Sequence, residues 1–280
     1  MVNINSNYAA SFAANAAKQK MSALDSAMER LSTGKRINYA RDDAAGQAIA
    51  VRLTAEIQGL AVAARNAADA QSLIDTAEGA LQESTSLLLR MRELAVQSSN
   101  STNSDADRAA LQVEAASLEA EISRIANTTT WGGKKLLDGT FSGTEDSAGR
   151  TFQIGTTSGE TIELSIPEMT ATAATIGYSV AHSIGSFTGA QSAIGSIDTA
   201  LSGVNEVRAQ MGAASNRLNS TIGNLNQIRV NLMASKGRIM DTDFAAETGN
   251  LAKGQILQQA ATAMLAQANA SKQSVLVLLQ

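Results

Sequence analysis

A seven-residue repeat of apolar and small side chains runs from about residue 42 to residue 99. Two rows recur at this interval: Leu60, Ala67, Ile74, Leu81, Leu88 and Ala95 in one, and Ala63, Ala70, Ala77, Ser84 and Met91 in the other. A heptad repeat sustained over several turns predicts a coiled-coil helix, and the small residues of the second row let helix axes approach closely. Such a helix would be roughly 85 Å long.

Further helices are predicted on both sides of this one. Apolar residues three or four positions apart indicate helices over Asn3–Leu31, over about 105–125 and over Ile194–Leu232, and a last helix follows to the C-terminus. Gly34 is placed to end the first helix, since glycine is common just past a helix end. Asp105 could cap the second helix, and Thr242 or Asp243 the last. Arg208, Ser215 and Arg229 interrupt the apolar row of 194–232.

The middle of the chain, 128–184, differs in kind because it is rich in Gly, Ser and Thr. Phe152 and Ile154 alternate with polar residues, and so do Ile162, Leu164 and Ile166, which predicts a β-hairpin with its turn at 156–160. The order of elements is nearly palindromic. We therefore expect a mainly α fold, a long antiparallel helical coiled-coil bundle formed by the paired N- and C-terminal regions, with a small β-hairpin insert at its far tip.

Composition narrows the class of protein. Hydrophobic residues make up 44% of the 280 positions but aromatic ones only 3%, and there is one proline, which suits long helices packed on helices. A formal net charge of -4 without a basic stripe argues against a nucleic-acid partner. The sequence contains no run of about 18 apolar residues, so it predicts no membrane-spanning helix. Residues 1–30 lack the apolar core of a cleavable signal peptide.

The residue types that carry chemistry are scarce. His182 is the only histidine and cysteine is absent, so no metal cluster is expected. The Asp-Thr-Asp run 241–243 lacks the rest of a calcium loop, and helix capping is the better interpretation. The run 132–135 lacks the spacing of a phosphate loop and indicates a turn. We therefore predict no catalytic residue, no metal ligand and no cofactor, so the chain is not expected to be an enzyme.

Several segments resemble bacterial flagellins, in order and at both ends of the chain. These are Arg30–Asn38, Asp42–Gly46, Arg90–Gln97, Lys134–Gly139, Arg238–Asp243, Ala263–Asn269 and Val275–Leu276. The resemblance covers about 1–140 and 190–280. It departs from the family in the middle, where many flagellins carry large outer domains, and at Trp131 and Gly132, where Phe-Asn is expected.

The resemblance implies a structural subunit that polymerises into the extracellular filament of the bacterial flagellum, exported by the type III route without a cleavable signal peptide. It implies an inner coiled-coil core of 1–40 and 240–280, a helical bundle of 41–139 and 186–239, and a solvent-facing insert of 140–185. We expect residues 1–35 and 245–280 to be disordered in the monomer and to order on assembly. The implied partners are further copies of the chain, hook-associated and cap proteins, and an export chaperone.

Two groups of residues are candidate contact sites. By resemblance, Arg90, Leu94 and Glu114 match positions that flagellins present to a vertebrate Toll-like receptor and to neighbouring subunits. Leu94 lies off the main heptad rows, so it is expected outside the core. The apolar end formed by Val275, Leu276, Leu278 and Leu279 would be exposed on a free subunit and is the expected chaperone and assembly tail.

Two alternative functions remain open at this stage. A hook–filament junction protein shares the paired-termini plan, but it would cap filaments without extending them. An enzyme would need a nucleophile with its base, a metal cluster or a phosphate loop, and the sequence shows none of these.

Overall fold

The computed structural model describes residues 6–141, 150–171 and 183–277. Within them the helices are α1 (Tyr8–Thr33), α2 (Ala44–Ser98), α3 (Asp105–Thr128), α4 (Phe187–Met240) and α5 (Phe244–Val277), and the strands are β1 (Thr130–Trp131), β2 (Lys134–Lys135), β3 (Arg150–Gln153) and β4 (Thr161–Leu164). The mainly α class with a small β-hairpin is confirmed. The chain divides into a terminal unit, residues 1–57 and 230–280, and a central unit, residues 58–229.

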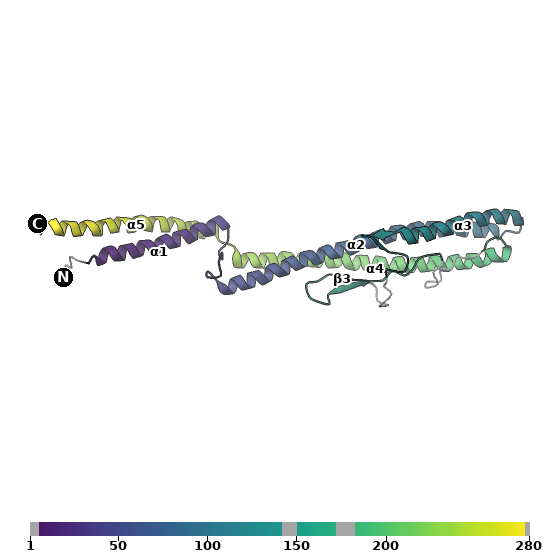
Figure 1. Cartoon of the computed structure of the whole chain (residues 1–280), viewed down its shortest axis with the longest axis horizontal. Helices are drawn as coiled ribbons and strands as arrows, with labels where there is room; N and C mark the ends of the chain where they lie inside the picture. Colours follow the sequence, from purple (N-terminus) through teal and green to yellow (C-terminus); the bar gives the residue numbers. More distant parts are fainter. Residues whose placement is uncertain (1–5, 142–149, 172–182, 278–280) are drawn as a thin grey trace. The chain divides into compact units, whose positions relative to one another are not determined.

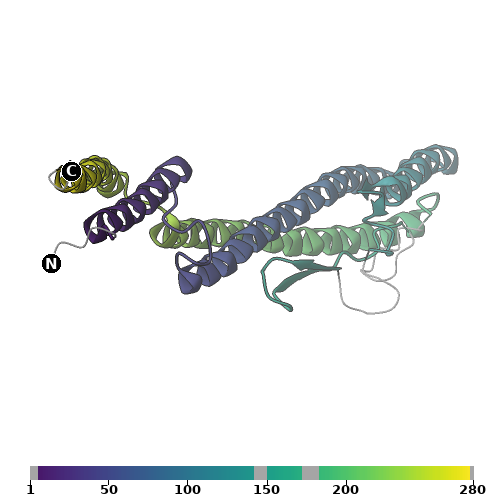
Figure 2. The ribbon, with the colours of Figure 1, turned by 60° about the vertical axis from the view of Figure 1, so that its left-hand side comes forward.

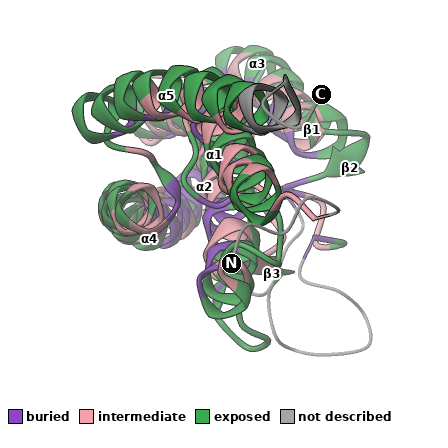
Figure 3. Ribbon diagram, turned by 90° about the vertical axis from the view of Figure 1, so that its left-hand side faces the viewer, coloured by how far each residue is buried: buried purple, intermediate pink, exposed green. Residues whose placement is uncertain are grey.

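The terminal unit pairs the two ends of the chain as antiparallel helices, α1 beside α5 (Figures 1 and 2). The amide of Asn7 donates to the carbonyl of Ala268 at 3.3 Å near one end, and Arg30 lies 3.7 Å from Glu247 near the other. Within Tyr8–Thr33 only Ala27 is buried. Figure 3 accordingly shows both helices mostly exposed or intermediate, so their pairing in one chain removes little apolar surface from water.

A joint formed by residues 34–43 and 240–243 ties the two halves of the terminal unit together. Gly34 ends α1 in the left-handed conformation, at φ +70°, as the sequence predicted. Its carbonyl accepts from the N–H of Thr242 at 3.0 Å, and the N–H of Arg36 donates to Met240 at 2.6 Å. Beneath the joint, Ile37 packs with Ala50 and Met240 in a small apolar cluster.

The capping predictions were right for one helix and wrong for another. The Asp243 carboxylate accepts from the N–H groups of Ala245 and Ala246, so it caps α5 as expected. Asp105 does not cap α3, because it is the first helical residue; Ser104 is the cap, in a reciprocal capping box with Asp107. Ser104 and Asp107 together satisfy two N–H groups that have no partner within the start of the helix. Asp105 as the cap would satisfy only one.

The core of the central unit lies along α2, which contacts α3 and α4. Its buried positions include both predicted heptad rows, from Leu60 to Ala95. Two of the three polar interruptions on α4 have partners on α2: Arg208 lies 2.7 Å from Glu78, and Ser215 is 2.7 Å from the amide of Gln71. The two contacts show that α2 and α4 run antiparallel, because the residue numbers rise along α2 as they fall along α4. The third, Arg229, has a buried Nε without a hydrogen bond among the described residues.

The insert forms the predicted hairpin, but its expected place at the far tip is wrong. Strands β3 and β4 pair antiparallel, with Phe152 opposite Ile162. The hairpin lies beside α4 (Figure 1) and also contacts α2, where the amide of Asn66 donates to Gln153 at 2.9 Å. Ile162 and Leu164 are 5% exposed. One hairpin face therefore covers the core instead of facing solvent, because alternating apolar residues need an apolar partner.

Candidate interaction sites

The side chains of Arg90 and Glu114 form a two-point ion pair between α2 and α3. The Nε and Nη2 atoms of Arg90 donate to one carboxylate oxygen of Glu114 at 3.0 and 2.8 Å, and Nη1 donates to Glu93 at 2.9 Å. These hydrogen bonds to Glu93 and Glu114 raise the pKa of Arg90. Both partners of the interhelical pair are about half exposed. The structure therefore brings two of the three expected contact residues together on the surface of the central unit.

Leu94 lies elsewhere, in the hydrophobic core of the central unit, with 1% of its surface exposed. The expectation that it stands outside the core is wrong. α2 is covered by α3 on one side and α4 on the other, so its buried stripe is wider than the two heptad rows and takes in Leu73 and Leu94 as well. In this conformation Leu94 offers no side-chain surface to a receptor or to another subunit.

The outward face of α2 carries the apolar surface instead. Leu89 and Val96, seven residues apart and so on one face, are 50% and 48% exposed. They lie in an open groove of about 550 Å³ together with Arg92, Glu93 and Gln97. On the α4 side, Arg92 is paired with Asp198 at 2.7 Å. The accessible face between α3 and α4 therefore has an apolar centre and a charged rim.

The expected tail at the C-terminus is described only in part. The backbone of Val275 and Leu276 belongs to α5, while Leu278 and Leu279 lie outside the described residues. The tail stays a prediction.

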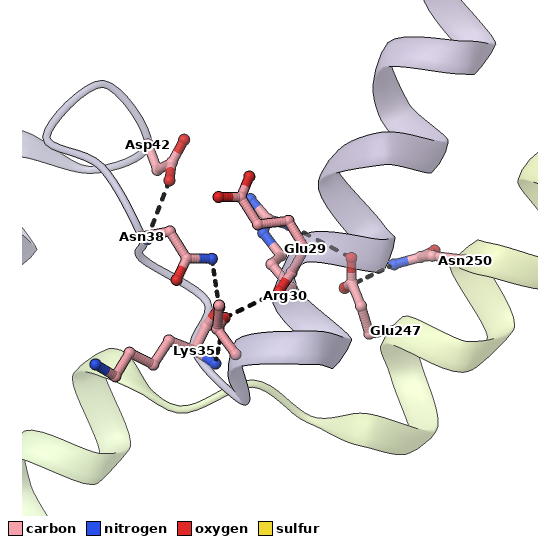
Figure 4. A network of polar contacts seen from close by, with 8 residues as sticks. Glu29, Arg30, Lys35, Asn38, Asp42, Glu247 and Asn250 are labelled. Atoms are coloured by element: carbon pink, nitrogen blue, oxygen red, sulfur yellow. Dashed lines mark hydrogen bonds and ion pairs between the residues drawn. The ribbon is translucent and has the colours of Figure 1, made fainter.

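Figure 4 shows a network of polar contacts around the end of α1. The Asp42 carboxylate accepts from the N–H groups of Asn38 and Tyr39 at 3.1 and 3.0 Å, and these bonds, that of Tyr39 first, lower the pKa of Asp42. Glu247, whose side chain is 10% exposed, has Arg30 at 3.7 Å and the Asn250 amide at 3.4 Å (Figure 4). Both contacts are long for a nearly buried carboxylate.

Sequence reasoning missed an anchor at the point where the chain enters α4. The backbone of buried Ile184 is held on both sides: its carbonyl accepts from the hydroxyl of Ser98, and its N–H donates to the amide oxygen of Gln112. Ser98 is fully buried. Nearby, Arg108 is 6% exposed and donates to the carbonyl of Asn100 at 2.9 Å. The two bonds to Ile184 join segments that are distant in sequence, and no local motif marks them.

The described ranges hold no cluster of three or more His, Cys, Asp or Glu side chains that could bind a metal, and His182 lies outside them. Across these same ranges, no helix is long and apolar enough to cross a bilayer. Within the run 132–135, Gly132 and Gly133 form the turn between β1 and β2, at φ +58° and +79°, and Lys134 and Lys135 are strand β2. Both values suit a two-residue hairpin turn.

Comparison with known proteins places these features in a family. Residues 4–142 match the family model described as the bacterial flagellin N-terminal helical region, and residues 194–279 match the bacterial flagellin C-terminal helical region. A flagellin of Halalkalibacterium halodurans is 49% identical over 254 residues, 91% of each chain. Flagellin A of Vibrio cholerae is 36% identical over an alignment of 383 residues that covers all of both chains.

Two solved structures are also similar. The crystal structure of Bacillus cereus flagellin has 32% sequence identity and a TM-score of 0.49, and the match covers 57% of this chain and 88% of that one. A putative flagellar hook-associated protein from Vibrio parahaemolyticus has a TM-score of 0.57 at 16% identity, covering 71% of this chain and all of that one. The second likeness concerns the fold alone.

Proposed function

Because this chain belongs to the bacterial flagellin family, whose members are structural subunits of the extracellular flagellar filament, we propose that its paired helices α1 and α5 make the contacts through which copies polymerise. The observation that carries this is the apolar surface of the pair. Tyr8, Phe12, Ile256 and Met264 are between 64% and 78% exposed. Large apolar side chains left in water along two helices favour burial against other copies.

The same surface supports ordering on assembly. A helix pair that buries few side chains gains little to offset the conformational entropy of ordering its residues. Residues 1–35 and 245–280 therefore order fully only when neighbouring copies cover them. Amide hydrogen exchange should show fast exchange at both ends in the monomer and slow exchange in the filament. Full protection of both ends in the monomer would refute this.

Seeded growth tests the filament function. Purified monomer is mixed with short filament fragments and the products are examined by negative-stain electron microscopy. We expect long tubes growing from the seeds. Seeds that stay short and are blocked from further growth would favour the alternative, a hook–filament junction protein, which would cap a filament without extending it.

The C-terminal tail is proposed as the binding segment of an export chaperone, which would cover Val275, Leu276, Leu278 and Leu279 before the subunit leaves the cell. Four apolar residues so close together in the sequence would otherwise promote premature association. Deleting residues 271–280 is expected to abolish both chaperone binding and polymerisation. A truncated chain that still forms filaments at the wild-type rate would contradict this.

Receptor recognition is a second proposed function, for a vertebrate Toll-like receptor. It is supported by the surface position of Arg90 and Glu114, and it assigns direct contact to these two residues and not to buried Leu94. A reporter-cell assay should show reduced signalling for Arg90→Ala and for Glu114→Ala, with Arg124→Ala, which breaks an ion pair elsewhere on the central unit, as the control. Unchanged signalling would remove this proposal.

The remaining partners are inferred from the family alone. Hook-associated proteins would bind the first subunits at the base of a filament, and a cap protein would hold the growing end. Export without cleavage predicts that the mature protein keeps its N-terminal residues, which mass spectrometry of extracellular filaments would check.

A further inference from the structure

The α1–α5 pair carries a groove with unsatisfied positive charge. The groove has a volume of about 390 Å³. Its lining includes Glu247 and Asn250, and its floor is formed by small or apolar residues. These are Ala23, Ser26, Ala27, Gly254 and Leu257. A Cβ added to Gly254 would come within 3.3 Å of Leu24. The helices therefore approach closely beside Gly254.

The rim of this groove is cationic. Lys20 and Arg30 come from α1, and Lys253 comes from α5. Arg30 has Glu247 at 3.7 Å as a partial counter-charge. Within the ranges that the structure describes, Lys20 and Lys253 have no ion-pair partner, and both are exposed. The groove can thus accept one or two negative charges from outside the chain.

The opposite face of α1 carries the complementary pattern. Met21, Asp25 and Met28 follow the i, i+4, i+7 spacing of one helix face. Met21 and Met28 are 49% and 46% exposed, and Asp25 is exposed with no ion pair among the described residues. Ala27 lies on the groove floor, and Asp25 is two positions from it, so the two residues are about 200° apart around the helix axis. The chain therefore cannot place this face in its own groove.

We infer that the groove receives the Met21–Asp25–Met28 face of a second copy, with the two methionines against the small-residue floor and the carboxylate between Lys20 and Lys253. Two features commit the site to this occupant. The charges are opposite in sign and unpaired on both sides, and the flexible thioether side chains suit a shallow apolar floor. The inference rests on the proposed filament function, since it names the residues of one contact in that polymer.

The contact joins two different surfaces of identical copies, so it is heterologous. A heterologous contact leaves a free groove at one end of a row of copies and a free Met–Asp–Met face at the other, and an open polymer grows from them. A symmetric dimer would need each copy to place its Met–Asp–Met face in the other's groove at the same time, which two surfaces on opposite sides of α1 do not allow. The geometry of the two faces therefore favours extension over closure.

Charge exchange tests this contact. The critical monomer concentration for seeded growth is measured by sedimentation, with electron microscopy of the product. Asp25→Lys should raise it by about tenfold or more, because like charges then meet at the groove rim. Asp25→Asn should raise it by a smaller factor. The triple variant Asp25→Lys, Lys20→Glu, Lys253→Glu should return close to the wild-type value, since the charges are again opposite.

The controls separate this inference from the proposed function. Unfolding of the central unit, followed by Trp131 fluorescence, should be the same in every variant, because the three changed residues lie in the terminal unit. If the wild type does not extend seeds, the filament function itself fails. If the wild type grows but Asp25→Lys grows equally well, or the triple variant stays as defective as Asp25→Lys alone, the contact is refuted.

Discussion

Leu89 and Leu94 lie on the same helix, α2, and differ chiefly in burial: 50% of Leu89 is exposed but only 1% of Leu94. Truncating each to alanine removes the same three carbon groups. At about 0.8 kcal/mol per buried CH₂, the buried leucine loses roughly 2.4 kcal/mol of transfer free energy, and the cavity left behind brings the total to about 3 kcal/mol. Half-exposed Leu89 should lose about 1 kcal/mol or less.

Urea unfolding measures the difference. The chain has one tryptophan, and Trp131 packs against the core of the central unit, so its fluorescence reports unfolding there. With a slope of about 2 kcal/mol per molar urea, Leu94→Ala should lower the midpoint by roughly 1.5 M and Leu89→Ala by about 0.5 M or less. Equal shifts for the two variants would show that Leu94 is not buried in solution, and the assignment of the core would be wrong.

The result also decides how receptor or assembly data are interpreted. Arg90→Ala breaks ion pairs that are half exposed, and such pairs contribute at most about 1 kcal/mol. A loss of signalling in Arg90→Ala would therefore report on direct contact. A similar loss in Leu94→Ala would report on a destabilised central unit, so this variant needs its unfolding curve measured beside it.

Further predictions concern single side chains. Ser98→Ala should cost about 1–3 kcal/mol in urea unfolding, because it leaves a buried carbonyl unpaired; no change would mean that water reaches this site. Gly79→Ala should stabilise α2 by about 0.5–1 kcal/mol, since a Cβ there meets nothing within 4 Å. Gly132→Ala should destabilise the β1–β2 turn because of its positive φ. In the same unfolding assay, the changes in the free energy of unfolding of the two variants should have opposite signs. Hydrogen bonds from a serine hydroxyl and then a backbone N–H lower the pKa of Asp107. The start of α3 should therefore be fully stabilised above the ordinary aspartate pKa and lose this contribution as pH falls through the lowered one, as amide exchange would show; Asp107→Asn should remove the dependence.

Periodicity predicted the helices well because each long helix has a persistent apolar stripe. It predicted the width of the stripe less well. Two heptad rows describe a helix with one partner, whereas α2 has two helical neighbours, and so Leu73 and Leu94 are buried beyond those rows. A single sequence does not state how many neighbours a helix has. The wrong expectation for Leu94 follows from this.

The insert shows a second limit. Alternation predicted that Ile162 and Leu164 share a face, and that face is buried. It did not predict which surface covers them, because the partner residues lie on helices far away in sequence. The polar anchors on Ile184 were missed for the same reason: Ser98 and Gln112 bond to backbone atoms 86 and 72 positions away. Side-chain bonds to a distant backbone have no spacing signature.

The polar residues between α2 and α4 have a role beyond their contribution to the stability of the protein. Gln71 bonds Ser215 and Glu78 bonds Arg208, so the contacts are one heptad apart on both helices. A slip of α4 by seven residues would keep apolar rows facing each other, but it would place Ser215 opposite Glu78 and leave Arg208 without a carboxylate. We therefore expect these pairs to fix register, a known use of polar residues in coiled coils.

A double replacement tests the register argument. In the variant Glu78→Leu, Arg208→Leu the ion pair is replaced by apolar contact, and since both side chains are about one-third exposed, the free energy of unfolding should change by no more than about 1 kcal/mol. The alignment of α4 along α2 should change more than the free energy of unfolding. Spin labels at Glu83 and Glu206 should give one narrow distance distribution in the otherwise wild-type chain and a second, longer or shorter population in the variant. A single narrow distribution in both would show that apolar packing alone fixes the register of this helix pair, and that the two polar contacts are dispensable for it.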